Sequence, residues 1–412
     1  MQYRNINRLF TLACFSMPPI VGSATSVIWH GGALWCVFEV VSRRRRLSSD
    51  SAMRWIATLM ILYVVANFVA FLVNDPSWQS VYKLLPLATF ALFPFSYSIW
   101  TIANREEVAQ AALVGAVIAS FGALIIAFVQ SGFLGLRAEG GAGNALVFAD
   151  VACLAGLTCL AGGLTLDSKK ALVLLLAFAA AFGAVLLSES RSVWLVMIVL
   201  ALLQLFIFRA RVFTVLRGHV LALLGVALLL LILTSGLIVS RFDALWQNVD
   251  RLMAAGDYNT SIGLRVALWE SGVRLFAESP IFGHGMQNTT ALIKEYVLRD
   301  FGIEVGFTHF HNGFMTIFIE GGIVAGCAMI AMFAVITFYA IRSLGNKEDP
   351  LARLGGAMLL MLAAVYVGGG SVNVMFGHDI LDAVFMVFLI VGLFLVQGTY
   401  RASDRRDLHI HQ

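Results

Sequence analysis

The sequence contains little charge for its length. Of its 412 residues only 13% are Asp, Glu, Lys or Arg, whereas 60% are hydrophobic, and the mean hydropathy is +0.87. Soluble globular domains have about 25% charged residues and roughly 45–50% apolar ones. The shortage of charge therefore excludes an ordinary soluble protein and indicates an integral membrane protein.

Alternation of apolar and polar residues is also absent from the long apolar runs. Only α-helices and closed β-barrels satisfy every backbone hydrogen-bonding group in lipid, and barrel strands alternate with a period of two. We therefore predict an all-α, polytopic membrane protein. The sequence has no internal repeat and no symmetry between halves of the kind found in many secondary transporters.

Cysteine is scarce, and its positions argue against two of its usual roles. The five cysteines, all inside apolar runs, are Cys14, Cys36, Cys153, Cys159 and Cys327. Disulfide frameworks and zinc sites place cysteines at regular spacings in polar or loop-rich segments. We therefore interpret all five as small core residues.

Apolar runs of about 20 residues, the length that crosses a bilayer, predict twelve membrane helices. The expected spans are 8–21, 24–41, 54–73, 84–103, 108–129, 145–165, 171–188, 193–208, 219–240, 313–341, 353–371 and 380–398. An even number of spans puts both chain ends on the same side of the membrane.

The first apolar run resembles a secretory signal peptide. Arg4 and Arg8 precede the run 9–21, and small residues follow at 22–24. However, the apolar region continues to Val41, which is too long for a cleaved signal segment. We expect it to be retained as the first span.

Arginine-rich segments indicate the orientation of the chain. They lie in one class of predicted short loops and comprise the run 43–46, Arg209, Arg211 and Arg217, and Arg401, Arg405 and Arg406. Cytoplasmic loops are enriched in Lys and Arg, so we place these loops and both chain ends in the cytoplasm. The predicted division is membrane helices in 1–240, a long periplasmic loop with short helices in 241–311, and three further spans with a cytoplasmic tail in 312–412. An odd number of spans would overturn this sidedness.

The long loop contains a segment with the period of an amphipathic helix. On a helical wheel of residues 262–276, Arg265 falls in the middle of a broad apolar face that includes Leu268 and Val273, whereas Arg274 lies on the polar face one turn from Glu270. An arginine on an apolar face either extends to an edge or binds an anion in a dehydrated cleft. Its central position favours anion binding.

Two further arginines lie in short segments on the predicted periplasmic side. Arg191 sits in a tight turn between two spans, where the residues alone favour an interfacial anchor or a partner for Glu189. Arg137 lies in a Gly-rich loop, 135–144, which is more typical of a hinge than of a phosphate site. The long loop has six Lys or Arg against eight Asp or Glu, so it is not a basic patch and predicts no nucleic-acid partner.

Two histidines precede the tenth predicted span. His309 and His311 would share one face of an extended segment and so permit a metal site, but no Cys or carboxylate motif completes one. An unperturbed pKa of about 6.5 suits a general base. We therefore expect no metal and consider His311, next to Asn312, a candidate base.

Taken together, these motifs resemble those of the O-antigen ligase and polymerase family of bacterial envelope enzymes. They are Arg265-x-x-x-Trp269, Pro-Ile-Phe-Gly-His-Gly at 280–285, His311-Asn312, Glu-Gly-Gly-Ile-Val-Ala-Gly at 320–326, Ser190-Arg191-Ser192 and Arg137. The resemblance implies transfer of a glycan from undecaprenyl diphosphate to an acceptor hydroxyl at the periplasmic face of the inner membrane, without a cofactor. Twelve spans and one long loop look more like the ligase, whose acceptor is the lipid A core oligosaccharide.

The same resemblance implies the site residues. Catalytic roles fall to His311 as base and to Arg265 and Arg191, which stabilise the leaving diphosphate; the substrate-binding residues are Arg137, His309, Asn312 and Trp269. Glu304 and Glu320 remain alternative bases. Other functions also stay open: an O-antigen polymerase, a protein O-oligosaccharyltransferase with the same donor, or a transporter of lipid-linked glycans, which should carry more charge at mid-membrane.

Overall fold

The computed structural model describes residues 2–166, 171–216 and 220–397. Throughout these ranges the ordered elements are helices, sixteen of them α-helices, which confirms the all-α class. Polar side chains begin several helices by accepting a hydrogen bond from a backbone N–H group of the first turn. Such caps are Asn104, Asn144, Thr260, Asn312 and Asp349.

The helices follow one another through short connections. The first nine are α1 (Gln2–Ser16), α2 (Pro18–Val21), α3 (Ala24–Val41), α4 (Ser51–Val73), α5 (Leu85–Trp100), α6 (Arg105–Phe128), α7 (Ala145–Thr165), α8 (Ala171–Leu187) and α9 (Arg191–Ile207). The remaining seven are α10 (Arg209–Leu216), α11 (Val220–Ala255), α12 (Ser261–Glu278), α13 (Thr289–Phe301), α14 (Gly313–Leu344), α15 (Pro350–Gly370) and α16 (Asp379–Gln397). Three short non-α turns are η1 (Trp78–Leu84), η2 (Val129–Phe133) and η3 (Gly140–Ala142).

Seven helices within the described ranges are long and apolar enough to cross a membrane. They coincide with the predicted spans 24–41, 54–73, 108–129, 145–165, 313–341, 353–371 and 380–398. Of the other five predicted spans, 8–21 overlaps α1 and α2, and 219–240 overlaps α11. The remaining three fall on α5, α8 and α9, which have 16 or 17 residues each. A polytopic membrane protein is therefore confirmed, and the number twelve stays a prediction.

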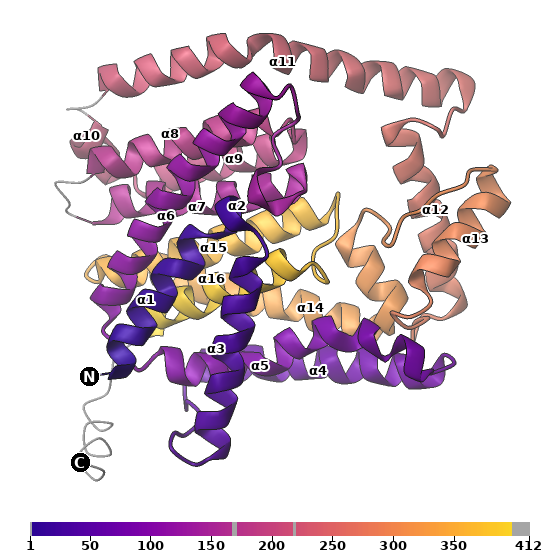
Figure 1. Cartoon of the computed structure of the whole chain (residues 1–412), viewed down its shortest axis with the longest axis horizontal. Coiled ribbons are helices and arrows are strands. Elements are labelled where there is room, and N and C mark those ends of the chain that lie inside the picture. The colour runs from indigo at the N-terminus through magenta and orange to yellow at the C-terminus, as the bar shows by residue number, and fades with distance from the viewer. Residues whose placement is uncertain (1, 167–170, 217–219, 398–412) are drawn as a thin grey trace.

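Most helices pack into one bundle, and two lie beyond its end. Helix α14 packs against α4 and α15, and α7 packs against α8, α6 and α15. Helices α12 and α13 extend past one end of the bundle, away from the start of α1, while α11 runs along its side (Figure 1). The two groups have separate apolar cores. The second core, formed around Leu268, Ile293 and Phe310, holds α12 and α13 to α14.

Polar contacts identify the two ends of the bundle. At one end Arg105 pairs with Asp349 at 2.9 Å and Arg4 pairs with Glu107 at 2.8 Å. At the other end the Nε of Arg137 donates to the carbonyl of Ser188 at 2.6 Å. Helix α6 runs from the first end to the second. The N–H of Ser48, close to the arginine run 43–46, donates to Ser98 near the end of α5, shortly before α6 begins. The arginine run and the loop with Arg137 therefore lie at opposite ends of the bundle.

Some predicted features differ from the structure or lie outside it. Helix α11 continues without a break across the predicted boundary at 240, because its residues keep helical backbone as far as Ala255. Four cysteines are buried, but the core interpretation is wrong for Cys327, which faces outward from α14. Arg217, Arg401, Arg405 and Arg406, and with them the predicted tail, lie outside the described residues.

The N-terminal apolar run is packed into the bundle. Phe15 of α1 is 1% exposed, and the centroid of its ring lies 4.4 Å from that of Phe388 on α16. Trp29 of α3 is fully buried. These contacts agree with a run that forms part of the folded protein.

The predicted orientation can be tested by cysteine labelling in sealed cells. In a background lacking the exposed Cys327, we expect a membrane-impermeant maleimide to label Asp250→Cys and Thr290→Cys but not Leu47→Cys, because the first two lie on the α11–α13 side and the third follows the arginine run. Permeabilised cells, in which all three should react, provide the control. Labelling of Leu47→Cys in sealed cells would reverse the sidedness.

Candidate functional site

The segment 280–285 docks against a kink in helix α14. The N–H groups of His284 and Gly285 donate to the carbonyls of Ile319 and Glu320 at 2.7 and 2.9 Å. In return, the N–H of Ile323 donates to the carbonyl of Pro280 at 2.8 Å. The turn therefore uses backbone groups that the kink releases from the helix.

Glycine is required on both sides of this contact. Gly322 has φ 68°, and a Cβ there would lie 2.0 Å from the carbonyl oxygen of Ile281. Gly283 also has φ 68°, and its Cβ would lie 2.6 Å from the carbonyl oxygen of Glu320. Both positions combine a left-handed backbone with close approach, which side chains do not tolerate. The Pro-Ile-Phe-Gly and Glu-Gly-Gly motifs thus interlock.

An open cleft of about 410 Å³ is lined in part by the first turns of α12. Four of the seven predicted site residues line it together: Arg137, Arg191, Arg265 and His311. They come from the Gly-rich loop, the start of α9, the first turns of α12 and the segment before α14. Three guanidinium groups and an imidazole thus meet from four separate parts of the chain.

Arg137 is held by the turn that follows α8. Its Nε donates to the carbonyl of Ser188 at 2.6 Å, and one terminal nitrogen donates to Oγ of Ser190 at 3.1 Å. Ser190 Oγ donates in turn to the carbonyl of Ala145 at 3.2 Å. These bonds orient the Arg137 fork, which a hinge role alone would not require.

Arg191 begins helix α9 two residues after a strained residue, with Ser190 between them. Glu189 has φ 57°, a left-handed conformation that is uncommon outside glycine. Strain of this kind persists only where the surroundings impose it and gathers at functional sites. The turn points Arg191 into the cleft together with Ser190 and Ser192.

Arg265 is half-buried on α12. Burial lowers its pKa, and the positive charge of Arg191 lowers it further. The buried residues of α12 include Ala267, Leu268 and Leu275, but Val273, which the wheel placed on the apolar face, is 63% exposed. The predicted face was too broad, because the neighbouring core covers only one side of the helix.

Arg274 has a different partner from the one expected. It donates to Asp300 of α13 at 2.8 Å and not to Glu270. A partner on another helix was out of reach of local spacing rules. Arg274 does not line the cleft, so the two arginines of α12 have separate surroundings.

His311 occupies a strained position beside the cleft. Its φ is 48°, and its ring makes edge contacts with those of Phe307 and His309 at 4.7 and 4.5 Å between centroids. Burial, then the neighbouring His309 and the charge of Arg265, lower the pKa of His311 to about 4. The imidazole is therefore in its neutral form near pH 7, and one of its ring nitrogens carries a lone pair.

The other three predicted site residues do not line the cleft. Asn312 caps α14, with its Oδ1 accepting from the N–H of Met315 at 3.1 Å. Trp269 packs against the second core. The ring of His309 contacts that of His311, and burial lowers the pKa of His309. Their positions follow from packing that spacing along the chain does not reveal.

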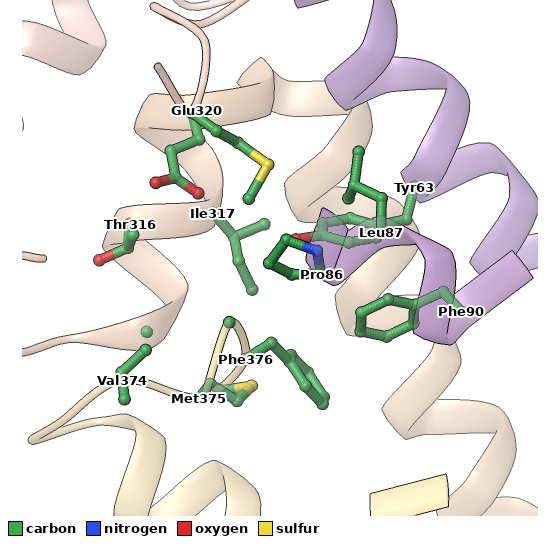
Figure 2. Close-up of a pocket in the computed structure, with 13 residues that line it drawn as sticks. Tyr63, Pro86, Leu87, Phe90, Thr316, Ile317, Glu320, Val374, Met375 and Phe376 are labelled. Atoms are coloured by element: carbon green, nitrogen blue, oxygen red, sulfur yellow. The ribbon is translucent and has the colours of Figure 1, made fainter. Parts of the chain in front are cut away.

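The two alternative bases lie elsewhere. Glu304 is exposed and is not a cleft residue. Glu320 is buried in α14, where its Oε1 accepts from Thr289 at 2.9 Å, and it borders a separate small cavity of about 20 Å³ (Figure 2). Glu320 therefore borders a different cavity from the one that the arginines line.

The cleft also contains residues that the sequence interpretation missed. Asn373 is 7% exposed and comes from the loop between α15 and α16, and Glu139, Glu189 and Ser261 line the walls. The available signal for Asn373 was its polar side chain in the short loop between two predicted spans, on the same predicted side as Arg137 and Arg191. The loop carries no motif of its own, so the residue was not singled out.

This fold and this cleft define a polytopic α-helical membrane protein with a cationic site at one end of its bundle. A family model described as O-antigen ligase matches residues 176–330, a segment that contains Arg191, Arg265 and His311. The match confirms the resemblance that the motifs predicted. It supports a glycan-handling membrane protein of the O-antigen ligase or polymerase type.

A protein of Haemophilus influenzae, described only as uncharacterized, shares part of this sequence. It is 25% identical over 165 residues, which are 39% of this chain and 41% of the relative. The chain thus aligns with less than half of that relative's length, and the comparison assigns no activity.

The electrostatic contact between Arg265 and His311 predicts a shift that can be measured. In the Arg265→Gln protein we expect the pKa of His311 to rise above about 4 but to stay below its ordinary value, because one positive charge is removed while burial, the largest cause, and His309 remain. Diethyl pyrocarbonate modification of His311, followed by mass spectrometry against pH, measures it. Arg274→Gln is the matched control and should leave the midpoint unchanged. A wild-type midpoint near 6.5 would contradict the buried cationic setting.

Proposed function

We propose that this protein is a metal-independent glycosyltransferase of the O-antigen ligase kind. It transfers a glycan from undecaprenyl diphosphate to the lipid A core oligosaccharide, at the periplasmic face of the bacterial inner membrane. The observation that carries the proposal is the convergence of three arginines and one neutral histidine in a single open cleft. Such a site suits a diphosphate ester and a hydroxyl acceptor.

The arginines suit the leaving group. As the acceptor oxygen bonds to the anomeric carbon, the bond from that carbon to the diphosphate oxygen breaks, and undecaprenyl diphosphate leaves with the electron pair. Arg191 and Arg265 carry planar guanidinium groups, which bind phosphate oxygens in pairs without giving up a proton. Arg137, which the turn after α8 holds through Nε and one terminal nitrogen, adds positive charge beside them. Negative charge grows on the diphosphate during the reaction, so these contacts strengthen toward the transition state.

His311 suits the proton transfer. The acceptor hydroxyl loses its proton as its oxygen attacks, and the neutral imidazole takes that proton. With a pKa of about 4 the imidazole is in its neutral form at neutral pH, with one ring nitrogen able to accept a proton. Diphosphate bound among the arginines would offset the nearby positive charge and raise this pKa, which makes the base stronger once the donor is in place.

The alternative enzymes share this donor and differ in the acceptor. An O-antigen polymerase extends a second lipid-linked glycan, and a protein O-oligosaccharyltransferase glycosylates a protein hydroxyl. The position of the cationic cleft at one end of the bundle gives less support to a transporter, whose charges should line the middle of the membrane.

One reconstitution separates these functions. Purified protein is incubated without metal with undecaprenyl-diphosphate-linked glycan and, in parallel, with rough lipopolysaccharide, with donor alone, or with a Ser/Thr-rich periplasmic protein. Gel analysis should show glycan on the lipopolysaccharide only. A ladder of longer lipid-linked glycans would identify a polymerase, and labelled protein an oligosaccharyltransferase.

The two arginines of α12 should differ in function. We expect Arg265→Ala to abolish transfer, because the guanidinium in the cleft is lost, and Arg274→Ala to keep activity within about threefold, because exposed ion pairs contribute little. Arg265→Lys should also fail, since an ammonium cannot form two parallel hydrogen bonds. Equal loss in both alanine proteins, at equal membrane levels, would contradict the assignment.

Binding and turnover should separate in His311→Ala. This protein should bind undecaprenyl diphosphate with wild-type affinity through the arginines, while its turnover falls by roughly 10²–10⁴-fold, the usual effect of removing a general base. Equilibrium binding and single-turnover rates measure the two quantities. Turnover close to wild type would move the base assignment to Glu320 or Glu304, and loss of wild-type activity on adding a chelator would require the histidine pair to be reinterpreted as metal ligands.

A further inference from the structure

Thr316 makes two hydrogen bonds that meet on either side of His311. The N–H of Phe310 donates to Oγ1 of Thr316 at 3.3 Å. The same hydroxyl donates to the carbonyl of Asn312 at 2.9 Å. A threonine hydroxyl has one proton to give and lone pairs to accept with, so both bonds form at once. Thr316 therefore joins the residues before and after His311 through a single atom.

The residue between those two bonds is the strained one. His311 has φ 48°, a conformation that residues other than glycine rarely adopt. Such a conformation persists only where neighbouring contacts over-determine it. Phe310 is fully buried in the second core, and Asn312 is fixed as the cap of α14, so both flanks of His311 are anchored. Thr316 ties these two anchors together.

The placement of Thr316 separates it from direct chemistry. It is 7% exposed on the first turns of α14, and it borders the small cavity near Glu320 and not the cationic cleft. Figure 2 shows Thr316 one turn before Glu320 on the same helix, with its oxygen directed to the same side as the Glu320 carboxylate. The bonds of the hydroxyl lead to the cleft through the backbone on either side of His311.

We propose that Thr316 is a positioning residue for His311: its hydroxyl holds the backbone that aims the imidazole at the acceptor hydroxyl. This inference rests on the proposed function and adds a residue to it. A displacement of about 1 Å in a reacting group reduces rates by roughly 10²-fold. Loss of the hydroxyl should therefore lower turnover and leave diphosphate binding, which the arginines provide, unchanged.

The test compares variants that differ in the hydroxyl alone. Thr316→Val keeps the side-chain shape and removes both bonds, and Thr316→Ser keeps both bonds. Thr158→Val is the matched control, because Thr158 is a buried helical threonine whose hydroxyl donates to the carbonyl of Leu154, four residues earlier in the same helix, at 2.8 Å. We expect turnover to fall at least tenfold in Thr316→Val, and to stay within about threefold of wild type in Thr316→Ser and Thr158→Val. Binding of undecaprenyl diphosphate should be unchanged in all three.

A second measurement does not require activity. The rate of diethyl pyrocarbonate modification of His311 should rise in Thr316→Val, because the segment 310–312 is released, and should match wild type in the other two. Unchanged modification and turnover in Thr316→Val, or an equal loss of turnover in Thr158→Val, would overturn the positioning role. Wild-type protein and His311→Ala are assayed alongside: if wild-type protein shows no transfer, the proposed function fails, whereas transfer that depends on His311 but not on Thr316 refutes this inference alone.

Discussion

The contact between the 280–285 turn and the kinked helix α14 is the constraint on which the rest of the site depends. Three backbone hydrogen bonds cross it, each contributing about 1 kcal/mol net. Gly283 and Gly322 allow the two backbones to approach where a Cβ would overlap a carbonyl. Helix α12 ends shortly before this turn, and His311 lies one residue before Asn312, the cap of α14. The contact therefore positions Arg265 and His311 relative to the same helix.

A second constraint is the concentration of positive charge in the cleft. Arg191 lowers the pKa of Arg265, and Arg265 helps to lower the pKa of His311, so each group makes the others costlier to charge. The bundle tolerates this cost because Arg137 and its serine partners are hydrogen-bonded and the cleft remains open to solvent. Under the proposed function, a bound diphosphate would relieve the same repulsion.

Local patterns predicted those parts of the structure that depend on neighbouring residues. Lipid demands helices whatever the tertiary packing, so the all-α class followed from hydropathy. Predictions that depended on which other part of the protein a side chain packs against were less successful. The wheel could not show that Val273 lies outside the covered face, and i,i+4 spacing could not find Asp300 as the partner of Arg274. Likewise, Cys327 belongs to an apolar run but faces outward.

The sequence by itself determined the membrane class, the helical architecture and the motifs that contain Arg137, Arg191, Arg265 and His311, because these follow from hydropathy, period and residue identity. Only the tertiary structure decided that these four residues share one cleft while Trp269 and Asn312 serve packing and capping, and it alone added Asn373. The physical reason is that the cleft is assembled from five segments distant in the chain. Their meeting depends on helix packing and on the glycine contact at α14, neither of which leaves a periodic signal.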